Sequence, residues 1–131
     1  ELNADTPILL YAYGSYGSTI DPNFSTTRLS LLDRGFAYAI AHVRGGEYMG
    51  RNWYDDGKLF NKKNTFSDFI ICSKFLIEES MTSADHLYAY GGSAGRLLMG
   101  VILNGAPEAD PYTLLTLPPT PCVSILLTSC S

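Results

Sequence analysis

The chain has 131 residues, of which 46% are hydrophobic and 17% are charged. That length suffices for one domain with a single core but not for two, and the apolar content predicts a folded chain rather than a disordered one. A formal net charge of −4, with no cluster of cations, argues against a nucleic-acid surface. Every apolar stretch is interrupted well before the ~20 residues that a spanning helix needs, so we expect no membrane insertion.

The three cysteines, Cys72, Cys122 and Cys130, form no CxxC pair and no zinc-type spacing with His42 or His86. We therefore expect neither a metal nor another cofactor. An odd number of cysteines without a signal peptide predicts a reducing, cytoplasmic setting, in which Cys72 is buried as a small hydrophobe. The chain does not begin with methionine, so we expect a piece of a longer protein or a processed product.

The first half of the chain predicts two strands joined through a helix. The apolar run at residues 6–14 ends in glycine and is typical of a buried strand. Leucines near helical spacing in 26–35 predict a helix that ends at Gly35, and "FAYAIAHV" (36–43) predicts a second buried strand. The glycine-rich, polar segment 44–64 predicts a long loop, and long ordered loops often carry function.

The second half predicts a helix, a strand, a tight turn and another helix. Thr65 and Asp68 have the spacing of a capping box, and apolar residues at helical spacing follow them. "HLYAY" (86–90) predicts a third strand, and residues 94–104 predict a helix that a following glycine and proline stop. Strands that alternate with helices predict the α/β class, with a mostly parallel sheet and flanking helices.

The composition changes after Pro107. Residues 108–131 are rich in Thr, Leu, Pro and Ser and contain no cationic residue, so we treat them as a divergent tail behind a structured unit at 1–107. The apolar, β-branched content of 122–130 is compatible with a replacement strand. Without such a strand, "HLYAY" would be an apolar sheet edge through which chains could self-associate. A tail from altered splicing or a shifted reading frame explains the composition equally well.

The sequence "GGSAG" lies between the predicted third strand and the last predicted helix. In a strand–GxSxG–helix context the central serine occupies a strained turn from which its hydroxyl projects, which predicts a nucleophile elbow at Ser93. Gly91, Gly92 and Gly95 would form this elbow, because small residues let strand and helix pass closely. The amide of Ala94, at the start of the helix, is then placed to donate to an oxyanion. For the motif alone, a glycine-rich turn, such as one that binds phosphate, is the alternative.

Four blocks, "YAYGSYG", "LSLLDRGFAYAIAHVRGG", "MGRNWYDDGKLFNKKNTFSDFI" and "GGSAG", resemble the prolyl oligopeptidase family of serine peptidases, and its oligopeptidase B branch most closely. The resemblance implies part of an α/β-hydrolase catalytic domain, which in this family is normally joined to a β-propeller that admits only short peptides. By position, Ser93 would be the nucleophile, and Tyr13 would donate its hydroxyl to the oxyanion beside Ala94. Tyr16 would line the substrate cleft. Cleavage after Lys or Arg is implied for the parent protein only.

The catalytic base is the part of the site that the sequence does not supply. In this fold an acid and then a histidine follow the serine, yet residues 94–131 contain no histidine. His42 lies near the end of a predicted strand, where a structural hydrogen bond is the favoured reading. His86 begins the strand before Ser93, roughly seven residues at ~3.3 Å each away, and cannot reach it. The bulky Arg96 also departs from the glycine usual in the family.

Three functions are compatible with these features. The first is a serine oligopeptidase that works by acyl transfer, complete in a parent protein and truncated here. The second is a catalytically inactive hydrolase fragment with a binding or regulatory role, and the missing histidine favours it for the isolated chain. The third is an esterase, because GxSxG by itself does not choose peptide over ester bonds.

Overall fold

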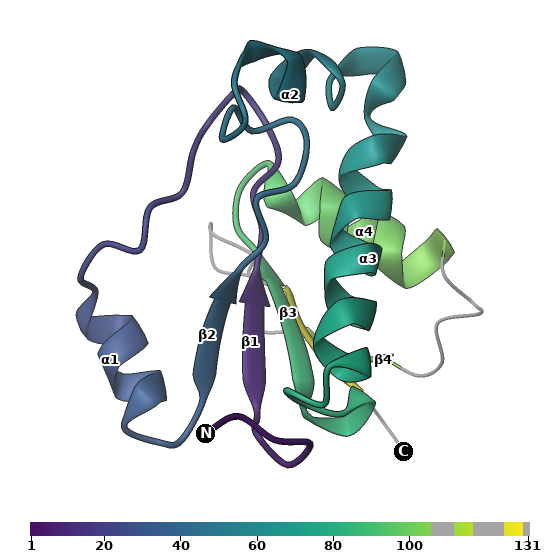
Figure 1. Ribbon diagram of the computed structural model, residues 1–131. Coiled ribbons are helices and arrows are strands. Elements are labelled where there is room, and N and C mark those ends of the chain that lie inside the picture. Colours follow the sequence, from purple (N-terminus) through teal and green to yellow (C-terminus); the bar gives the residue numbers. More distant parts are fainter. Residues whose placement is uncertain (106–111, 117–124, 130–131) are drawn as a thin grey trace.

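The centre of the molecule is a set of three parallel strands. The computed structural model describes residues 1–105, 112–116 and 125–129, and Figure 1 shows how these are arranged. Strand β1 (Ile8–Tyr11) lies between β2 (Ala37–Ile40) and β3 (Leu87–Gly91), parallel to both. The three predicted parallel strands are therefore present; β1 and β2 are shorter than their apolar runs, and β3 is displaced by one residue from "HLYAY". The α/β class is confirmed.

Two further strands extend the sheet from the tail. Strand β5 (Ile125–Ser129) pairs antiparallel with β3, and β4 (Tyr112–Thr116) pairs antiparallel with β5, which gives the order β2-β1-β3-β5-β4. The strand that we considered for 122–130 thus corresponds to β5, and the rest of that range lies outside the described residues. With β5 in place, "HLYAY" is not a sheet edge, because β3 has a neighbour on both sides. The condition under which we expected self-association through this strand is therefore not met.

The helices largely follow the sequence pattern, but the predicted loop at 44–64 is partly helical. The helical elements are α1 (Thr26–Leu32), α2 (Arg51–Asp55), the 3-10 turn η1 (Leu59–Asn61), α3 (Lys63–Glu78), the 3-10 turn η2 (Ala84–His86) and α4 (Gly95–Gly105). Two of them, α2 and η1, fall in the predicted loop. Both are too short to bury an apolar face, so the sequence shows no helical spacing of apolar residues there.

Thr65 and Asp68 do not form the predicted capping box. Lys62 is the N-cap of α3, so Thr65 already lies inside the first turn. Its hydroxyl instead donates to the carbonyl oxygen of Arg44 at 2.6 Å. Asp68 accepts from the backbone nitrogen of Arg44 at 2.9 Å and from its guanidinium at 2.8 and 2.6 Å. Residue types that suit a cap also suit tertiary hydrogen bonds, and here they fasten the segment after β2 to α3.

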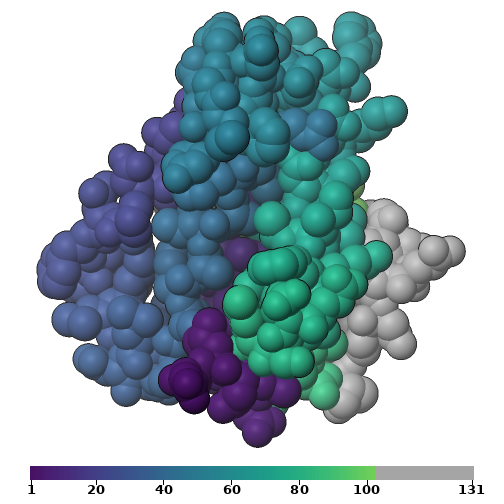
Figure 2. Space-filling view, viewed as in Figure 1, coloured from purple at the N-terminus to yellow at the C-terminus, as the bar shows by residue number. Residues whose placement is uncertain are grey.

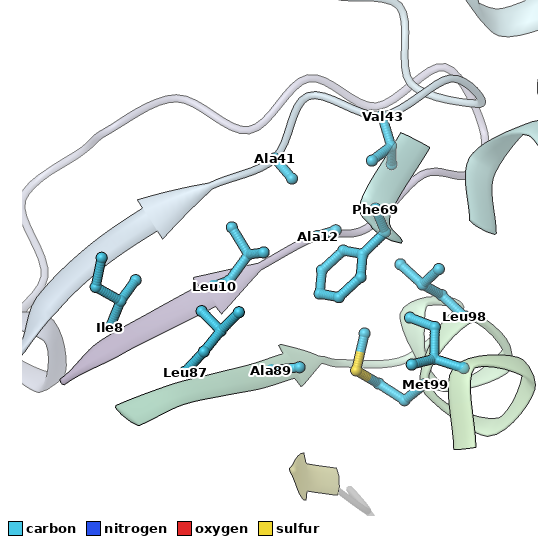
Figure 3. Packing of buried hydrophobic residues seen from close by; sticks show 11 residues of the cluster. Ile8, Leu10, Ala12, Ala41, Val43, Phe69, Leu87, Ala89, Leu98 and Met99 are labelled. Carbon is cyan, nitrogen blue, oxygen red and sulfur yellow. The ribbon is translucent and has the colours of Figure 1, made fainter. Parts of the chain in front are cut away.

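The hydrophobic core fills the space between the parallel strands and the helices α3 and α4 (Figure 3). Alternate residues of β1 and β3 point into it, as expected for strands with one face against a core. The labelled members are Ile8, Leu10, Ala12, Ala41, Val43, Phe69, Leu87, Ala89, Leu98 and Met99. Cys72 packs against this cluster with a free thiol, and burial raises the pKa of that thiol. Cys122 and Cys130 lie outside the described residues.

An apolar groove of about 290 Å³ runs along the same face, between β2 and α3. In Figure 2 the purple of β1 is visible between the blue of the β2 segment and the teal of α3. Leu10 lies among the lining residues, and Ile71 and Phe75 of α3 border the groove while staying more than half exposed. No described helix is both long and apolar enough to cross a membrane.

The carboxyl ends of β1 and β3 lie side by side, and the connections that involve these strands run in opposite directions across the sheet. Helix α1 leads from β1 to β2, and α3 leads back past β1 to β3 (Figure 1). Right-handed crossovers in opposite directions place α1 on one face of the sheet and α3 on the other. Helix α4 contacts α3 and so follows β3 on that second face. The carboxyl ends of neighbouring strands with divergent connections are where open α/β sheets bind ligands.

Candidate active site

The turn between β3 and α4 has a strained backbone at its serine. Ser93 has φ = 52°, in the left-handed region that costs a non-glycine residue about 1–3 kcal/mol. The helix begins at once, because the amides of Gly95 and Arg96 donate to the carbonyl oxygens of Gly92 and Ser93 at 2.9 and 3.1 Å. Ser93 is exposed. The backbone therefore has the geometry expected of a nucleophile elbow, with the serine at its tip.

Two of the three elbow glycines are required by close packing. A Cβ atom on Gly91 would lie 2.6 Å from the carbonyl oxygen of Gly95, and one on Gly95 would lie 2.9 Å from that of Ala12. Both distances are shorter than real Cβ contacts allow. Gly92 differs, since a Cβ there would meet only the Tyr90 hydroxyl at an ordinary 3.7 Å. Close approach thus accounts for Gly91 and Gly95 but not for Gly92.

The same packing places the elbow against the end of β1. The amide of Ala12 donates to the carbonyl oxygen of Tyr90 at 3.2 Å, which continues the β1–β3 pairing past the strand ends. The Cβ position of Gly95 lies 3.7 Å from Cα of Tyr13. Among the described residues, neither the Tyr13 hydroxyl nor the Ala94 amide has a hydrogen-bond partner. Two uncommitted donors therefore come from chain segments that pack against each other.

Tyr16 lies on the turn that follows Tyr13. Its ring centroid is 6.5 Å from that of Tyr13, with the two planes tilted by 49°. Tyr16 is 79% exposed, and its backbone has φ = 58°. Tyr13 and Tyr16 are thus neighbours across a strained turn, with Tyr16 reaching further into solvent.

Neither histidine of the chain contacts Ser93. The His42 ring stacks on Tyr48 with centroids 3.9 Å apart, and its carbonyl oxygen accepts from the Trp53 indole at 3.0 Å. His86 lies at the opposite end of β3, where its Nδ1 is 2.9 Å from the Ser83 hydroxyl. The part of the chain that the structure describes also holds no group of three metal-ligating side chains. Among the described residues, therefore, no histidine lies beside Ser93.

Arg96 follows the elbow on the first turn of α4. Its side chain is only partly exposed, and its Nε atom is enclosed without a hydrogen-bond partner among the described residues. A buried donor without a partner costs about 1–3 kcal/mol. Arg96 therefore adds a local energetic cost beside the serine.

Lys62 contacts the turn that follows Tyr13, and the sequence analysis did not predict this contact. Its ammonium donates to the carbonyl oxygen of Gly14 and, at 3.0 Å, to the hydroxyl of Ser15. It lines a pocket of about 350 Å³ together with Ser15, Tyr16 and Tyr54. Burial lowers the pKa of the Lys62 ammonium. "KK" at 62–63 reads as a pair of surface cations, and its partners lie 47 and 48 residues away, so no local signal could have found this contact.

A family model, related sequences and a solved structure all match this chain, and all three indicate peptidases of one family. A sequence model described as "Prolyl oligopeptidase family" matches residues 22–115. Dipeptidyl aminopeptidase BI of Pseudoxanthomonas mexicana is 55% identical over 121 residues, which are 92% of this chain and 17% of that protein. Protease 2 of Moraxella lacunata is 48% identical over 126 residues, 96% of this chain and 18% of that protein. The structure of oligopeptidase B from Leishmania major matches with a TM-score of 0.77 and 47% identity, over 83% of this chain and 15% of that chain.

The strand–turn–helix arrangement and these neighbours define an α/β-hydrolase. The chain belongs to the prolyl oligopeptidase family. It spans less than a fifth of the length of the relatives named above. The match to protease 2 covers 96% of the chain and so extends past Pro107.

Proposed function

We propose that this chain carries the nucleophile and the oxyanion hole of a serine-type oligopeptidase. In this proposal the Ser93 hydroxyl attacks the scissile carbonyl of a short peptide and forms an acyl-enzyme. The Tyr13 hydroxyl and the Ala94 amide donate to the oxyanion that develops. The observation that carries the proposal is the left-handed backbone of Ser93 on a turn packed against the end of β1, beside Tyr13.

The base and its carboxylate are proposed to come from outside these 131 residues. A serine hydroxyl is a weak nucleophile until a base accepts its proton, and that base later protonates the leaving amine. Neither His42 nor His86 is positioned for this.

We propose that residues 1–107 belong to the catalytic domain of a longer peptidase. The oligopeptidase B likeness supports cleavage after Lys or Arg, and the free Cys72 thiol fits a reducing, cytoplasmic compartment.

The second candidate is an inactive hydrolase fragment with a binding or regulatory role. It is favoured by one observation, the absence of any histidine near Ser93 among the described residues. In that case the turn at Ser93 would have only a structural role. The Tyr13 hydroxyl and the Ala94 amide would bind a peptide carbonyl, and the peptide would not be cleaved. The two candidates differ in whether Ser93 is chemically reactive.

Labelling of the 131-residue chain with a fluorophosphonate probe tests this difference. We expect the reaction to be slow near neutral pH and faster as pH rises, because hydroxide then replaces the missing base, and to be confined to Ser93. Loss of labelling in Ser93→Ala would support the peptidase. The matched control is Ser80→Ala, because Ser80 is also exposed and has φ = 56° but is not on the elbow. A chain that melts cooperatively and shows no Ser93-specific labelling at any pH would refute the peptidase and leave the inactive fragment.

Peptide and ester substrates compared side by side separate a peptidase from an esterase. Once a labelled Ser93 is established, chromogenic peptides ending in Arg, in Lys or in Pro before the reporter group test the preference for basic residues. In the longer parent peptidase, to which alone this preference is assigned, faster acylation by the Arg and Lys peptides than by the Pro peptide is the expected order. The reverse order would contradict the proposed specificity and leave the nucleophile intact.

A further inference from the structure

The turn at residues 14–17, which we call the oxyanion turn, carries Tyr13 on one side and Tyr16 within it. We propose that Lys62 is a positioning residue that holds the oxyanion turn in place, so that Tyr13 stays beside the elbow and Tyr16 stays in the cleft. The inference rests on the proposed function, because Tyr13 and Tyr16 have their roles only there. Lys62 itself need not touch the substrate for this role.

The oxyanion turn needs external support because its backbone is strained. Gly14, Tyr16 and Gly17 all lie in the left-handed region, with φ values of 63°, 58° and 64°. Tyr16 is not a glycine, and such a conformation persists only where surrounding contacts impose it. A turn of this kind, left without contacts, would relax and carry both tyrosines with it.

The inner side of the turn is held by close packing. The Gly17 amide donates to the carbonyl oxygen of Gly45 at 3.0 Å. A Cβ atom on Gly14 would collide with the side chains of Thr65 and Val43, and one on Gly45 would collide with the Gly14 carbonyl. The segment after β2 and the start of α3 therefore block movement of the turn toward the core.

The outer side of the turn faces the 350 Å³ pocket, and there Lys62 supplies the restraint. Its ammonium donates both to the carbonyl oxygen of Gly14 and to the hydroxyl of Ser15, so it spans two successive residues of the turn. Hydrogen bonds from a charged donor are roughly twice as strong as neutral ones. No carboxylate among the described residues pairs with this ammonium, so the turn oxygens are its described partners.

The backbone fixes the position from which Lys62 reaches the turn. Its amide donates to the carbonyl oxygen of Leu59 at 3.1 Å, and its own carbonyl accepts from the Thr65 amide at 3.1 Å. Thr65 is fully buried and bonded to the segment after β2. The adjacent Lys63 is exposed, and its side chain makes no hydrogen bond or ion pair with the described residues. The two lysines are neighbours in sequence, and only one of them contacts the oxyanion turn.

Three variants test the inference. Lys62→Met keeps an unbranched side chain, one heavy atom shorter, without N–H donors. Lys62→Arg keeps a cationic donor, and Lys63→Met is the matched control. For Lys62→Met we expect about tenfold faster exchange of the Gly17 amide and shifted ring resonances of Tyr13 and Tyr16, as for loss of a charge-assisted hydrogen bond. Labelling of Ser93 per folded molecule should fall by about tenfold. Lys62→Arg should restore part of both effects, and Lys63→Met should change neither.

The outcomes separate this inference from the proposed function. If wild-type Ser93 is labelled and folded Lys62→Met is labelled equally fast, Lys62 does not position the site and the inference is wrong. If wild-type Ser93 is never labelled, the proposed function fails, while the exchange of the Gly17 amide still reports whether Lys62 holds the turn. An unchanged Gly17 exchange rate in folded Lys62→Met also overturns the inference.

A measurement on the unmodified chain covers the case in which Lys62→Met does not fold. Nitrogen-15 spectra of the lysine ammonium groups should show the Lys62 signal protected from solvent exchange and the Lys63 signal exchanging freely. As pH rises, the Lys62 ammonium should lose its proton at a lower pH than an ordinary lysine, because burial lowers its pKa. A Lys62 signal that exchanges with solvent as freely as that of Lys63 would overturn the inference without any substitution.

Discussion

Gly95 and Gly100, two glycines of helix α4, should respond to alanine in opposite directions. At Gly95, the first residue of α4, the added Cβ would lie 2.9 Å from the carbonyl oxygen of Ala12, about half an ångström inside the 3.4 Å at which ordinary contact begins. That oxygen is backbone and cannot rotate away. At Gly100 an added Cβ would meet nothing within 4 Å.

The magnitudes follow from these environments. Overpacking typically costs about 1–3 kcal/mol, and alanine in place of glycine in a helix returns about 0.5–1 kcal/mol. Gly95→Ala should therefore lower the free energy of unfolding by about 1–2 kcal/mol, while Gly100→Ala should raise it by about 0.5–1 kcal/mol. Gly95→Ala must also push the elbow away from Tyr13, so labelling of Ser93 should fall in that variant alone.

Urea unfolding followed by fluorescence of Trp53, the single tryptophan, measures both free energies. Wild type, Gly95→Ala and Gly100→Ala are compared at the same temperature, with m-values checked for equality. A Gly95→Ala chain as stable as Gly100→Ala would refute the reasoning, because it would mean that α4 and the end of β1 are not in close contact. Equal labelling of Ser93 in the two variants would refute the link between that contact and the site.

Two further predictions concern the Arg44–Asp68 ion pair and the Cys72 thiol. Asp68→Asn should lower the free energy of unfolding by roughly 2–3 kcal/mol, because the carboxylate accepts three hydrogen bonds from Arg44. Asp55→Asn, at a more exposed ion pair, should give no resolvable change in parallel urea titrations, and similar losses in both would contradict this account. Because burial raises the pKa of the Cys72 thiol, iodoacetamide at about pH 8 should modify Cys72 more slowly in the folded chain than in urea. Peptide mass spectrometry measures the rates, and equal rates would mean that the thiol is accessible and unshifted.

The strained backbone of the turn at Ser93 was predictable because its signal is local. "GGSAG" between an apolar strand and a helix demands a strained serine and close packing, and the structure shows φ = 52° at Ser93 and tight contacts at Gly91 and Gly95. The parallel strands were equally visible, since buried strands read as continuous apolar runs. The strand ends were placed less well, because hydrogen-bonded pairing stops before the apolar run does. Tyr13 lies past the end of β1 in this way and enters the site as part of a loop.

Features that depend on distant partners were misread or missed. Thr65 and Asp68 have the spacing of a cap, but the position of Arg44, more than twenty residues earlier, decides that they bond to it instead. Lys62 reads as one of two surface cations until its contacts with Gly14 and Ser15, across nearly fifty residues, are seen. In both cases the competing local explanation was chemically reasonable, so sequence could not choose between them.

By itself, the sequence determined the class of fold, the location of the serine turn and the lack of a histidine after Ser93, since each rests on residue types and spacings of a few positions. Tertiary structure alone decided that β3 is not an edge, that the elbow rests on the end of β1 beside Tyr13, and that Lys62 supports the turn after it. The physical reason is the range of the interactions: backbone strain and hydrophobic periodicity are fixed locally, whereas the partners of a hydrogen bond are chosen only when the chain brings distant segments together.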